Sequence, residues 1–178
     1  MRTFLAINFK EEFKKKLYEN FSICDENLKL VKKENLHLTL IFLGDSLNKD
    51  NISKMIDIMK NLEFKRFKLS LSTPGIFPNL EKPKVLWLGI DEGGKELNEL
   101  YSFFYSYLIK ENIKIENNFL PHITIARIKN YISKEKIAEF MNQDFPELET
   151  DIESIDLMES KLNKISPSYF KIYSRQFL

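Results

Sequence analysis

The chain has 178 residues, of which 43% are apolar and 30% charged, and its 27 basic and 26 acidic residues leave a formal net charge of +1. This length and apolar content suffice for one packed domain, whereas the near-neutral charge excludes a protein that coats nucleic acid along a broad basic face. With one cysteine, Cys24, and two histidines, the sequence also excludes an internal disulfide and a zinc cluster of cysteines and histidines.

No segment of the sequence predicts export or membrane insertion. The N-terminal MRTFLAINF runs directly into charged residues and lacks the longer apolar core and the cleavage pattern of a signal peptide. No apolar run reaches the roughly 18 to 20 residues that cross a bilayer. We therefore expect a cytoplasmic protein without a membrane partner, and we expect it to be a monomer.

Strands and helices alternate in the first half of the chain. Hydrophobic periodicity and turn residues predict strands at 3–8, 28–31, 36–43 and 64–71, and helices at 10–21 and 48–62. Pro74-Gly75 and Pro78-Asn79 predict a loop after the fourth of these strands.

The same alternation continues in the second half. It predicts strands at 85–90, 121–128, 152–160 and 168–177, and helices at 95–110 and 133–141. Gly93-Gly94 separates the strand at 85–90 from the helix that follows it. Ser133 is placed to cap the first turn of the last helix.

A short repeat links the two halves. The segment Leu36–Leu40, LHLTL, recurs as Pro121–Ile125, PHITI, and a strand and a helix precede each copy. The repeat predicts an α+β fold of two related lobes in which the strands are mostly antiparallel.

Both histidines of the chain stand in this repeat, each two residues before a threonine. Because side chains alternate between the faces of a strand, His37 and Thr39 share one face while the leucines around them share the other. The same alternation puts His122 and Thr124 on one face. Each copy therefore buries an apolar side and offers an imidazole and a hydroxyl on the opposite side.

Two imidazoles and two hydroxyls are suited to phosphoryl chemistry. An imidazole has an ordinary pKa of about 6.5, so near neutral pH one copy holds a proton while the other lacks it, as concerted acid–base catalysis requires. Threonine hydroxyls donate to phosphoryl oxygens and orient the group between the imidazoles. Opening a strained cyclic phosphodiester needs no more than this, so we predict neither a metal nor another cofactor.

Two other interpretations of the histidines stay open at this point. Both imidazoles are also compatible with buried packing positions that hydrogen-bond to backbone, although their paired occurrence favours a functional role. A metal site is the poorer interpretation, because no carboxylate stands at ligand spacing from the two histidines.

Five segments in order extend the pattern beyond the two motifs. They are Arg2–Asn8 (RTFLAIN), Asn35–Asp45 (NLHLTLIFLGD), Gly75–Gly89 (GIFPNLEKPKVLWLG), Pro121–Arg127 (PHITIAR) and Leu157–Lys161 (LMESK). In these segments the sequence resembles the 2H phosphoesterase superfamily, which is named for two His-x-Thr/Ser-x motifs. It is most similar there to the bacterial and archaeal RNA 2′,3′-cyclic phosphodiesterases, historically called 2′-5′ RNA ligases.

The resemblance implies a single domain over residues 1–178, with a bilobal α+β fold whose pseudo-symmetric lobes flank a central cleft. It implies hydrolysis of RNA ends or nucleotides that carry a 2′,3′-cyclic phosphate, with a 2′-phosphate as the product. It makes His37 the proton donor to the departing 3′ oxygen, His122 the proton acceptor that activates water, and Thr39 and Thr124 the phosphate contacts. The two motifs are nearly equivalent in sequence, so the division of roles between the imidazoles comes from the resemblance alone.

Arg127 is a further candidate, because the family often has an arginine at this place and a guanidinium can hold a substrate phosphate. Simple alternation puts Arg127 on the face opposite His122, unless the strand twists or bulges near its end. An ordinary surface arginine is the alternative interpretation.

The aromatic residues near the motifs are expected to have structural roles. Phe4 and Phe42 are candidates for stacking on a base, but we favour core packing for both. Trp87 lies in an apolar strand and is expected in the core, and Tyr169 is expected to pack the closing strand.

Two other functions use the same residues. A 2′-5′ RNA ligase would run the reaction backwards, joining a cyclic-phosphate end to a 5′-hydroxyl end. A non-catalytic protein would bind RNA ends or nucleotides without turning them over.

Overall fold

A computed structural model describes residues 2–21, 23–44, 47–113, 115, 119–145, 148–161 and 167–178. Asp45, the last residue of the first motif segment, lies outside the described residues. The helices are α1 (Glu11–Glu19), α2 (Lys49–Lys60), α3 (Gly94–Lys110), α4 (Lys134–Met141) and the short 3-10 helix η1 (Lys33–Asn35). The strands are β1 (Arg2–Asn8), β2 (Leu28–Leu30), β3 (His37–Gly44), β4 (Phe67–Phe77), β5 (Val85–Ile90), β6 (His122–Ile128), β7 (Glu149–Ile152), β8 (Ser154–Lys161) and β9 (Ser168–Gln176).

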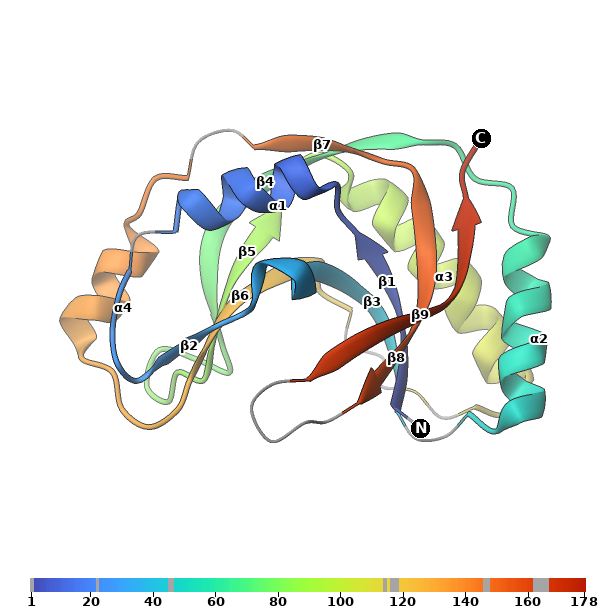
Figure 1. Ribbon diagram of the computed structural model, residues 1–178, viewed down its shortest axis with the longest axis horizontal. Coiled ribbons are helices and arrows are strands. Elements are labelled where there is room, and N and C mark those ends of the chain that lie inside the picture. Colours follow the sequence, from blue (N-terminus) through green and yellow to red (C-terminus); the bar gives the residue numbers. More distant parts are fainter. Residues whose placement is uncertain are drawn as a thin grey trace.

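The strands form one strongly curved sheet (Figure 1). Its order is β7-β4-β5-β6-β3-β1-β8-β9, and β2 pairs with β6 beside this path. Every described pairing is antiparallel, which confirms the prediction from the sequence.

Along this order the sheet divides into two sets of four strands, which meet between β6 and β3. The unit β1-α1-β3 corresponds to β5-α3-β6. In each unit the second strand, β3 or β6, lies at the junction of the two halves, and the first strand, β1 or β5, lies next to it on the outer side. The helices are exchanged between the halves: α3 contacts β3, while α1 places Leu17 beside Leu30 of β2 and Ile125 of β6. The predicted bilobal α+β fold is thus confirmed.

Helices cover the outside of both halves. In Figure 1, α3 lies behind the half that holds β1, β3, β8 and β9 and α2 lies at its right edge, while α1 and α4 flank the half that holds β4, β5 and β6. The inward stripe of α3 has the spacing of one helix face and consists of Leu97, Leu100, Phe104 and Leu108, all buried. One large apolar cluster joins side chains from both halves into a common core.

Local signals explain where the helices begin. The Asn48 side chain accepts a hydrogen bond from the Asn51 backbone N–H at the start of α2, and the Ser133 hydroxyl accepts one from Lys136 at the start of α4, as predicted. Gly93 precedes α3 with a φ of 90°. A Cβ there would approach the Lys68 carbonyl oxygen to 2.6 Å, so both the backbone conformation and the space require glycine.

Two predicted boundaries were wrong. The strand predicted at 64–71 continues through Pro74-Gly75 to Phe77, and its ladder with β5 is irregular between Leu71 and Pro74. Proline is tolerated because β7 pairs only with 67–70, so this part of β4 is an edge. The strand predicted at 152–160 is β8, which begins at Ser154, and the strand before it, β7, was not predicted; the chain crosses at Glu153 from β7, beside β4, to β8, beside β1.

Among the described residues, no helix is long and apolar enough to span a membrane.

Candidate active site

The two motif strands touch where the halves of the sheet meet. β3 and β6 are antiparallel, and Leu38 pairs with Ile123. One residue further along each strand, this register places His37 across from Thr124 and Thr39 across from His122. Because Leu38 and Ile123 are fully buried on one face, the two imidazoles and the two hydroxyls share the other, arranged about a local two-fold axis.

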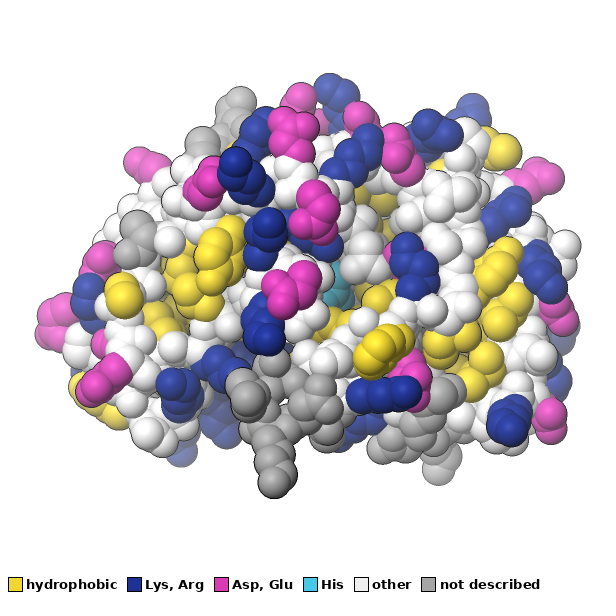
Figure 2. Space-filling view, viewed as in Figure 1, with side chains coloured by type: hydrophobic (Ala, Val, Ile, Leu, Met, Phe, Trp, Pro, Cys, Tyr) yellow, Lys and Arg dark blue, Asp and Glu magenta, His cyan; other side chains and the backbone are white. Residues whose placement is uncertain are grey.

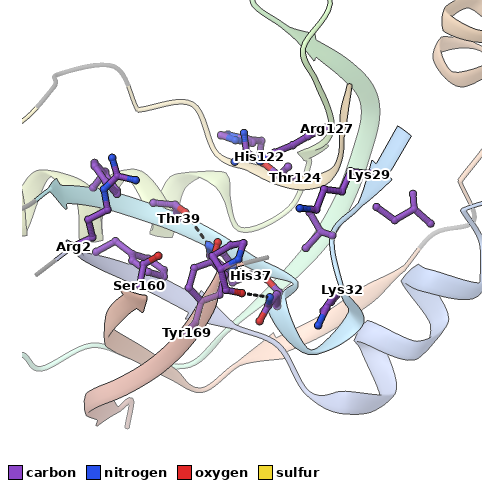
Figure 3. A pocket seen from close by; sticks show the side chains of 16 residues that line it. Arg2, Lys29, Lys32, His37, Thr39, His122, Thr124, Arg127, Ser160 and Tyr169 are labelled. Atoms are coloured by element: carbon purple, nitrogen blue, oxygen red, sulfur yellow. Dashed lines mark hydrogen bonds between the residues drawn. The ribbon is translucent and has the colours of Figure 1, made fainter. Parts of the chain in front are cut away.

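That face is the floor of a cleft of about 560 Å³. His37, Thr39, His122, Thr124 and Arg127 all line it, so the structure brings together the five site residues predicted from the sequence. Figure 3 shows the two imidazoles on neighbouring strands, with the threonines beside them. In Figure 2 a histidine is visible at the bottom of the hollow, with both basic and acidic side chains around it.

A bulge in β6 carries Arg127 into the cleft. Leu86 of β5 pairs with Ala126, whereas the next residue, Trp87, pairs with Thr124, so Ile125 is an extra residue in the ladder. Ile125 and Ala126 are both buried in succession, and Arg127 is exposed. The extra residue reverses the alternation, which puts Arg127 on the same face as His122.

β3 bulges at the matching position. Leu5 of β1 pairs with Ile41 and Ala6 pairs with Thr39, which leaves Leu40 as the extra residue. Phe42 is consequently 54% exposed and lines the cleft, so the expectation that it packs in the core was wrong. Phe42 and Arg127 are equivalent positions of the repeat, and the cleft has a ring at one and a guanidinium at the other. Phe4, by contrast, is buried as expected.

Backbone carbonyls fix the orientation of both imidazoles. Nδ1 of His37 donates to the carbonyl oxygen of Asn35, and Nδ1 of His122 donates to that of Leu120, each at 2.7 Å. A carbonyl only accepts, so the Nδ1 proton is present in both rings and the second nitrogen, Nε2, is the one that exchanges protons. In His37, Nε2 lies 3.1 Å from the Thr39 hydroxyl.

Burial lowers the pKa of both imidazoles below the ordinary value of histidine. The hydrogen bond to the backbone carbonyl opposes this effect in each ring, while repulsion from Arg127 lowers the pKa of both. Lys14 and His122 lower the pKa of His37 further. Near neutral pH the resting cleft therefore holds neutral imidazoles, and a bound phosphate anion would favour the return of a proton.

Aromatic rings support each imidazole. Phe4 and Tyr169 lie 5.2 and 5.1 Å from the His37 ring between centroids, and Phe77 lies 5.0 Å from that of His122. Trp87, which was expected in the core, is only half-buried and lies 5.8 Å from His122.

Tyr169 belongs to the cleft itself, where the sequence suggested only packing of the closing strand. Its position depends on the β8–β9 hairpin folding against β1, which no local signal in the sequence could predict.

The cleft is basic. Arg2, Lys29, Lys32 and Arg127 line it, and no described residue of its lining is acidic. Only Arg127 was identified from the sequence as a site residue, because Lys29 and Lys32 stand in no motif and Arg2, although it begins the segment Arg2–Asn8, was not singled out. Among the described residues, no group of three or more histidine, cysteine or acidic side chains is placed to hold a metal ion.

Comparison with known proteins agrees with this geometry. Residues 6–175 match the family model of the AKAP7 2′5′ RNA ligase-like domain. The chain belongs to this family of 2H phosphoesterases. A family relative from Thermotoga maritima, named RNA 2′,3′-cyclic phosphodiesterase, is 34% identical, and the match covers 99% of this chain and 96% of the relative. A relative of the same name from Methanocaldococcus jannaschii is 32% identical, with 95% and 96% covered.

Solved structures of 2H phosphoesterases share the fold. A Thermus thermophilus protein superimposes with a TM-score of 0.82 at 24% identity, covering 99% of this chain and 97% of that one. E. coli LigT, crystallised with 3′-AMP, superimposes with a TM-score of 0.77 at 20% identity over 99% and 97% of the two chains.

Proposed function

We propose that this 2H phosphoesterase is an RNA 2′,3′-cyclic phosphodiesterase, a metal-independent hydrolase that opens terminal 2′,3′-cyclic phosphates to 2′-phosphates. One observation carries the proposal: two imidazoles, each with Nδ1 bound to a carbonyl, share one cleft with two threonine hydroxyls and a guanidinium. The family relatives named for this activity support it.

The reaction needs one proton donor and one proton acceptor on opposite sides of phosphorus. His122, neutral at Nε2, takes a proton from water as the water oxygen bonds to phosphorus. The bond from phosphorus to the 3′ oxygen breaks, and protonated His37 gives its Nε2 proton to that oxygen. The 2′ ester remains, and proton exchange with solvent restores both rings.

The threonines and Arg127 stabilise the phosphoryl oxygens. Thr39 and Thr124 stand beside the two imidazoles in the local two-fold arrangement, so each hydroxyl can donate to one non-bridging oxygen. Arg127 supplies a charge-assisted contact to the negative charge that grows as water attacks.

An asymmetry of the cleft supports His37 as the acid. The leaving oxygen belongs to the ribose, so the acid lies on the side that holds the nucleoside. Tyr169 and Asn35, beside His37, line the cleft and offer a ring and an amide oxygen to a nucleotide, since the Asn35 amide nitrogen already donates to the Pro167 carbonyl. The rings that support His122, Phe77 and Trp87, are not part of the described lining.

We further infer that residues 1–178 act as one domain, because each half supplies one imidazole to the same cleft. We expect the chain to work as a monomer in the cytoplasm, where the exposed thiol of Cys24 stays reduced. Light scattering of the purified protein tests the monomer.

The decisive test uses a nucleoside 2′,3′-cyclic phosphate in the presence of EDTA. The wild-type protein is expected to release the 2′-phosphate, and His37→Asn and His122→Asn each to lose about three orders of magnitude or more in kcat, because the rings act as a pair. Asparagine keeps a similar volume in both positions, and near-ultraviolet circular dichroism checks the fold. Full activity in either variant would refute the acid–base pair.

Two further measurements on cyclic-phosphate substrates separate the alternative functions. A 2′-5′ RNA ligase would join a cyclic-phosphate RNA end to a 5′-hydroxyl RNA end, which gel electrophoresis detects. A non-catalytic binder would retain the cyclic phosphate unchanged and would bind it equally well after either substitution.

A further inference from the structure

The charge of the cleft exceeds what its proposed reaction needs. A 2′,3′-cyclic phosphate carries a single negative charge, for which one guanidinium suffices. The cleft is nevertheless lined by four cations, Arg2, Lys29, Lys32 and Arg127, and by no described acidic residue, in a chain whose net charge is only +1. The surplus indicates a ligand with more than one phosphate.

Two of these cations stand directly opposite each other. Lys29 of β2 and Arg127 of β6 are register partners in an antiparallel ladder. Both are exposed and both line the cleft, so they lie on the same face. A phosphate bound between them would make a charge-assisted contact with each.

Lys32 extends this pair toward His37. It precedes η1, whose last residue is Asn35, the carbonyl partner of His37. Its neighbour Lys33 lies 3.9 Å from the Glu11 carboxylate, whereas Lys32 has no acidic partner among the residues that the structure describes. Figure 3 shows Lys29 and Lys32 on one side of His37, and Arg2 with Ser160 on the other.

The direction of the RNA chain follows from the proposed function, on which this inference rests. With His37 protonating the 3′ oxygen, the terminal ribose lies on the His37 side of phosphorus. The phosphodiester at the 5′ carbon of that ribose then lies further along the cleft on the same side. There the described lining offers Lys29 and Lys32.

We propose that Lys29 and Lys32, with Arg127 beside them, form a second phosphate subsite for the phosphodiester that precedes the terminal nucleotide. The preferred substrate is therefore the end of an oligonucleotide, and a free cyclic nucleotide is a poor substrate because it leaves this subsite empty.

The test compares kcat/KM for two substrates with the same terminal base: a nucleoside 2′,3′-cyclic phosphate and a dinucleotide that ends in the cyclic phosphate. The variants are K29Q and K32Q, which remove the charge and keep most of the side chain. R2Q removes a charge from the other end of the cleft. K95Q removes one from α3, where Lys95 lies 3.9 Å from the Glu99 carboxylate.

We expect the wild-type protein to prefer the dinucleotide. K29Q and K32Q should each lose about tenfold on the dinucleotide, the size of one charge-assisted contact, and much less on the mononucleotide. R2Q and K95Q should keep the wild-type ratio between the two substrates.

A dinucleotide with an uncharged methylphosphonate linkage isolates the role of the charge. The wild-type protein should turn it over no better than K32Q turns over the natural dinucleotide, and K32Q should distinguish the two linkages less than the wild-type protein does. Equal rates on mononucleotide and dinucleotide, or a loss of preference in R2Q instead of the lysine variants, would overturn the subsite. Absence of turnover on both cyclic-phosphate substrates by the wild-type protein would instead refute the proposed function.

Discussion

The protons on the two imidazoles are set by groups that the motif itself positions. The carbonyl that holds Nδ1 belongs in each case to the residue two places before the histidine, Asn35 or Leu120. The carbonyl, the imidazole and the hydroxyl therefore come from five consecutive residues, 35–39 in one motif and 120–124 in the other, and the same geometry arises twice. This explains how two motifs with different neighbours reach equivalent ring orientations.

The lowered pKa values predict an acidic activity optimum. The pH profile of kcat/KM reports the free enzyme, in which burial lowers the pKa of both imidazoles and repulsion from Arg127 contributes to the lowering in each. The acid loses its proton at a lower pH than an ordinary histidine does. The maximum of the bell-shaped profile of kcat/KM should therefore lie below about pH 6.5.

Arg127→Gln provides a matched test of the same profile. Removing the guanidinium raises the pKa of both imidazoles, so the maximum of the profile should move toward higher pH. The value of kcat/KM at the maximum should fall, because the contact to the phosphate is lost. A profile centred above neutrality in the wild-type protein, or one that Arg127→Gln leaves in place, would contradict this account.

At the scale of elements, the bulges decide what the cleft contains. Without the extra residues Leu40 and Ile125, Phe42 and Arg127 would point into the core. Alternation is the only rule available for orienting side chains from the sequence of a strand, and it fails at a bulge. The expectation for Phe42 was wrong for this reason, and Arg127 reaches the cleft only through the bulge.

The β4–β5 pair also contributes, through the support it gives to His122. A Cβ on Gly75 would overlap the ring of Trp87, which packs against the imidazole. We expect Gly75→Ala to displace the indole, to destabilise the fold by about 1–3 kcal/mol, and to lower kcat by misorienting His122. Denaturant unfolding and steady-state kinetics measure the two effects.

Gly94→Ala is the matched control, because a Cβ there meets nothing within 4 Å. It should leave kcat unchanged and should not destabilise the protein, since alanine is the better helix former. A normal kcat in Gly75→Ala would show that Trp87 does not position His122.

At the scale of the whole molecule, the cleft exists only where the two halves meet. Each half supplies one imidazole and one hydroxyl, and the ladder pair Leu38–Ile123 relates them. Protonating the two imidazoles is unfavourable in the folded protein, because they are buried beside cations, so the cleft should make the stability of the fold depend on pH and on anions.

Acidification should destabilise the wild-type protein, without a bound anion, more than variants that lack the two imidazoles. Both imidazoles have lowered pKa values when folded, so below about 6.5 the unfolded chain binds more protons and stability falls as the pH falls. Thermal unfolding between pH 8 and 5 should show a smaller decline in the double variant His37→Asn/His122→Asn. Identical declines would contradict the linkage.

Inorganic phosphate should oppose this loss, because an anion in the cleft favours protonated imidazoles. The rise in Tm should therefore grow as the pH is lowered, and sodium chloride at equal ionic strength should not reproduce it. An equal rise with chloride would indicate general screening of surface charge instead.

Local order along the chain was sufficient to predict the strands, the helices and both His-x-Thr motifs, because periodicity, caps and alternation act between near neighbours in sequence. The fold class followed from the repeat, and the family from motifs spread over five segments. The opposing Lys29 and Arg127, the ring of Tyr169 beside His37 and the exposure of Phe42 followed only from the tertiary structure. Each depends on strand register or on a bulge, and these are set by pairing between segments that are distant in the chain.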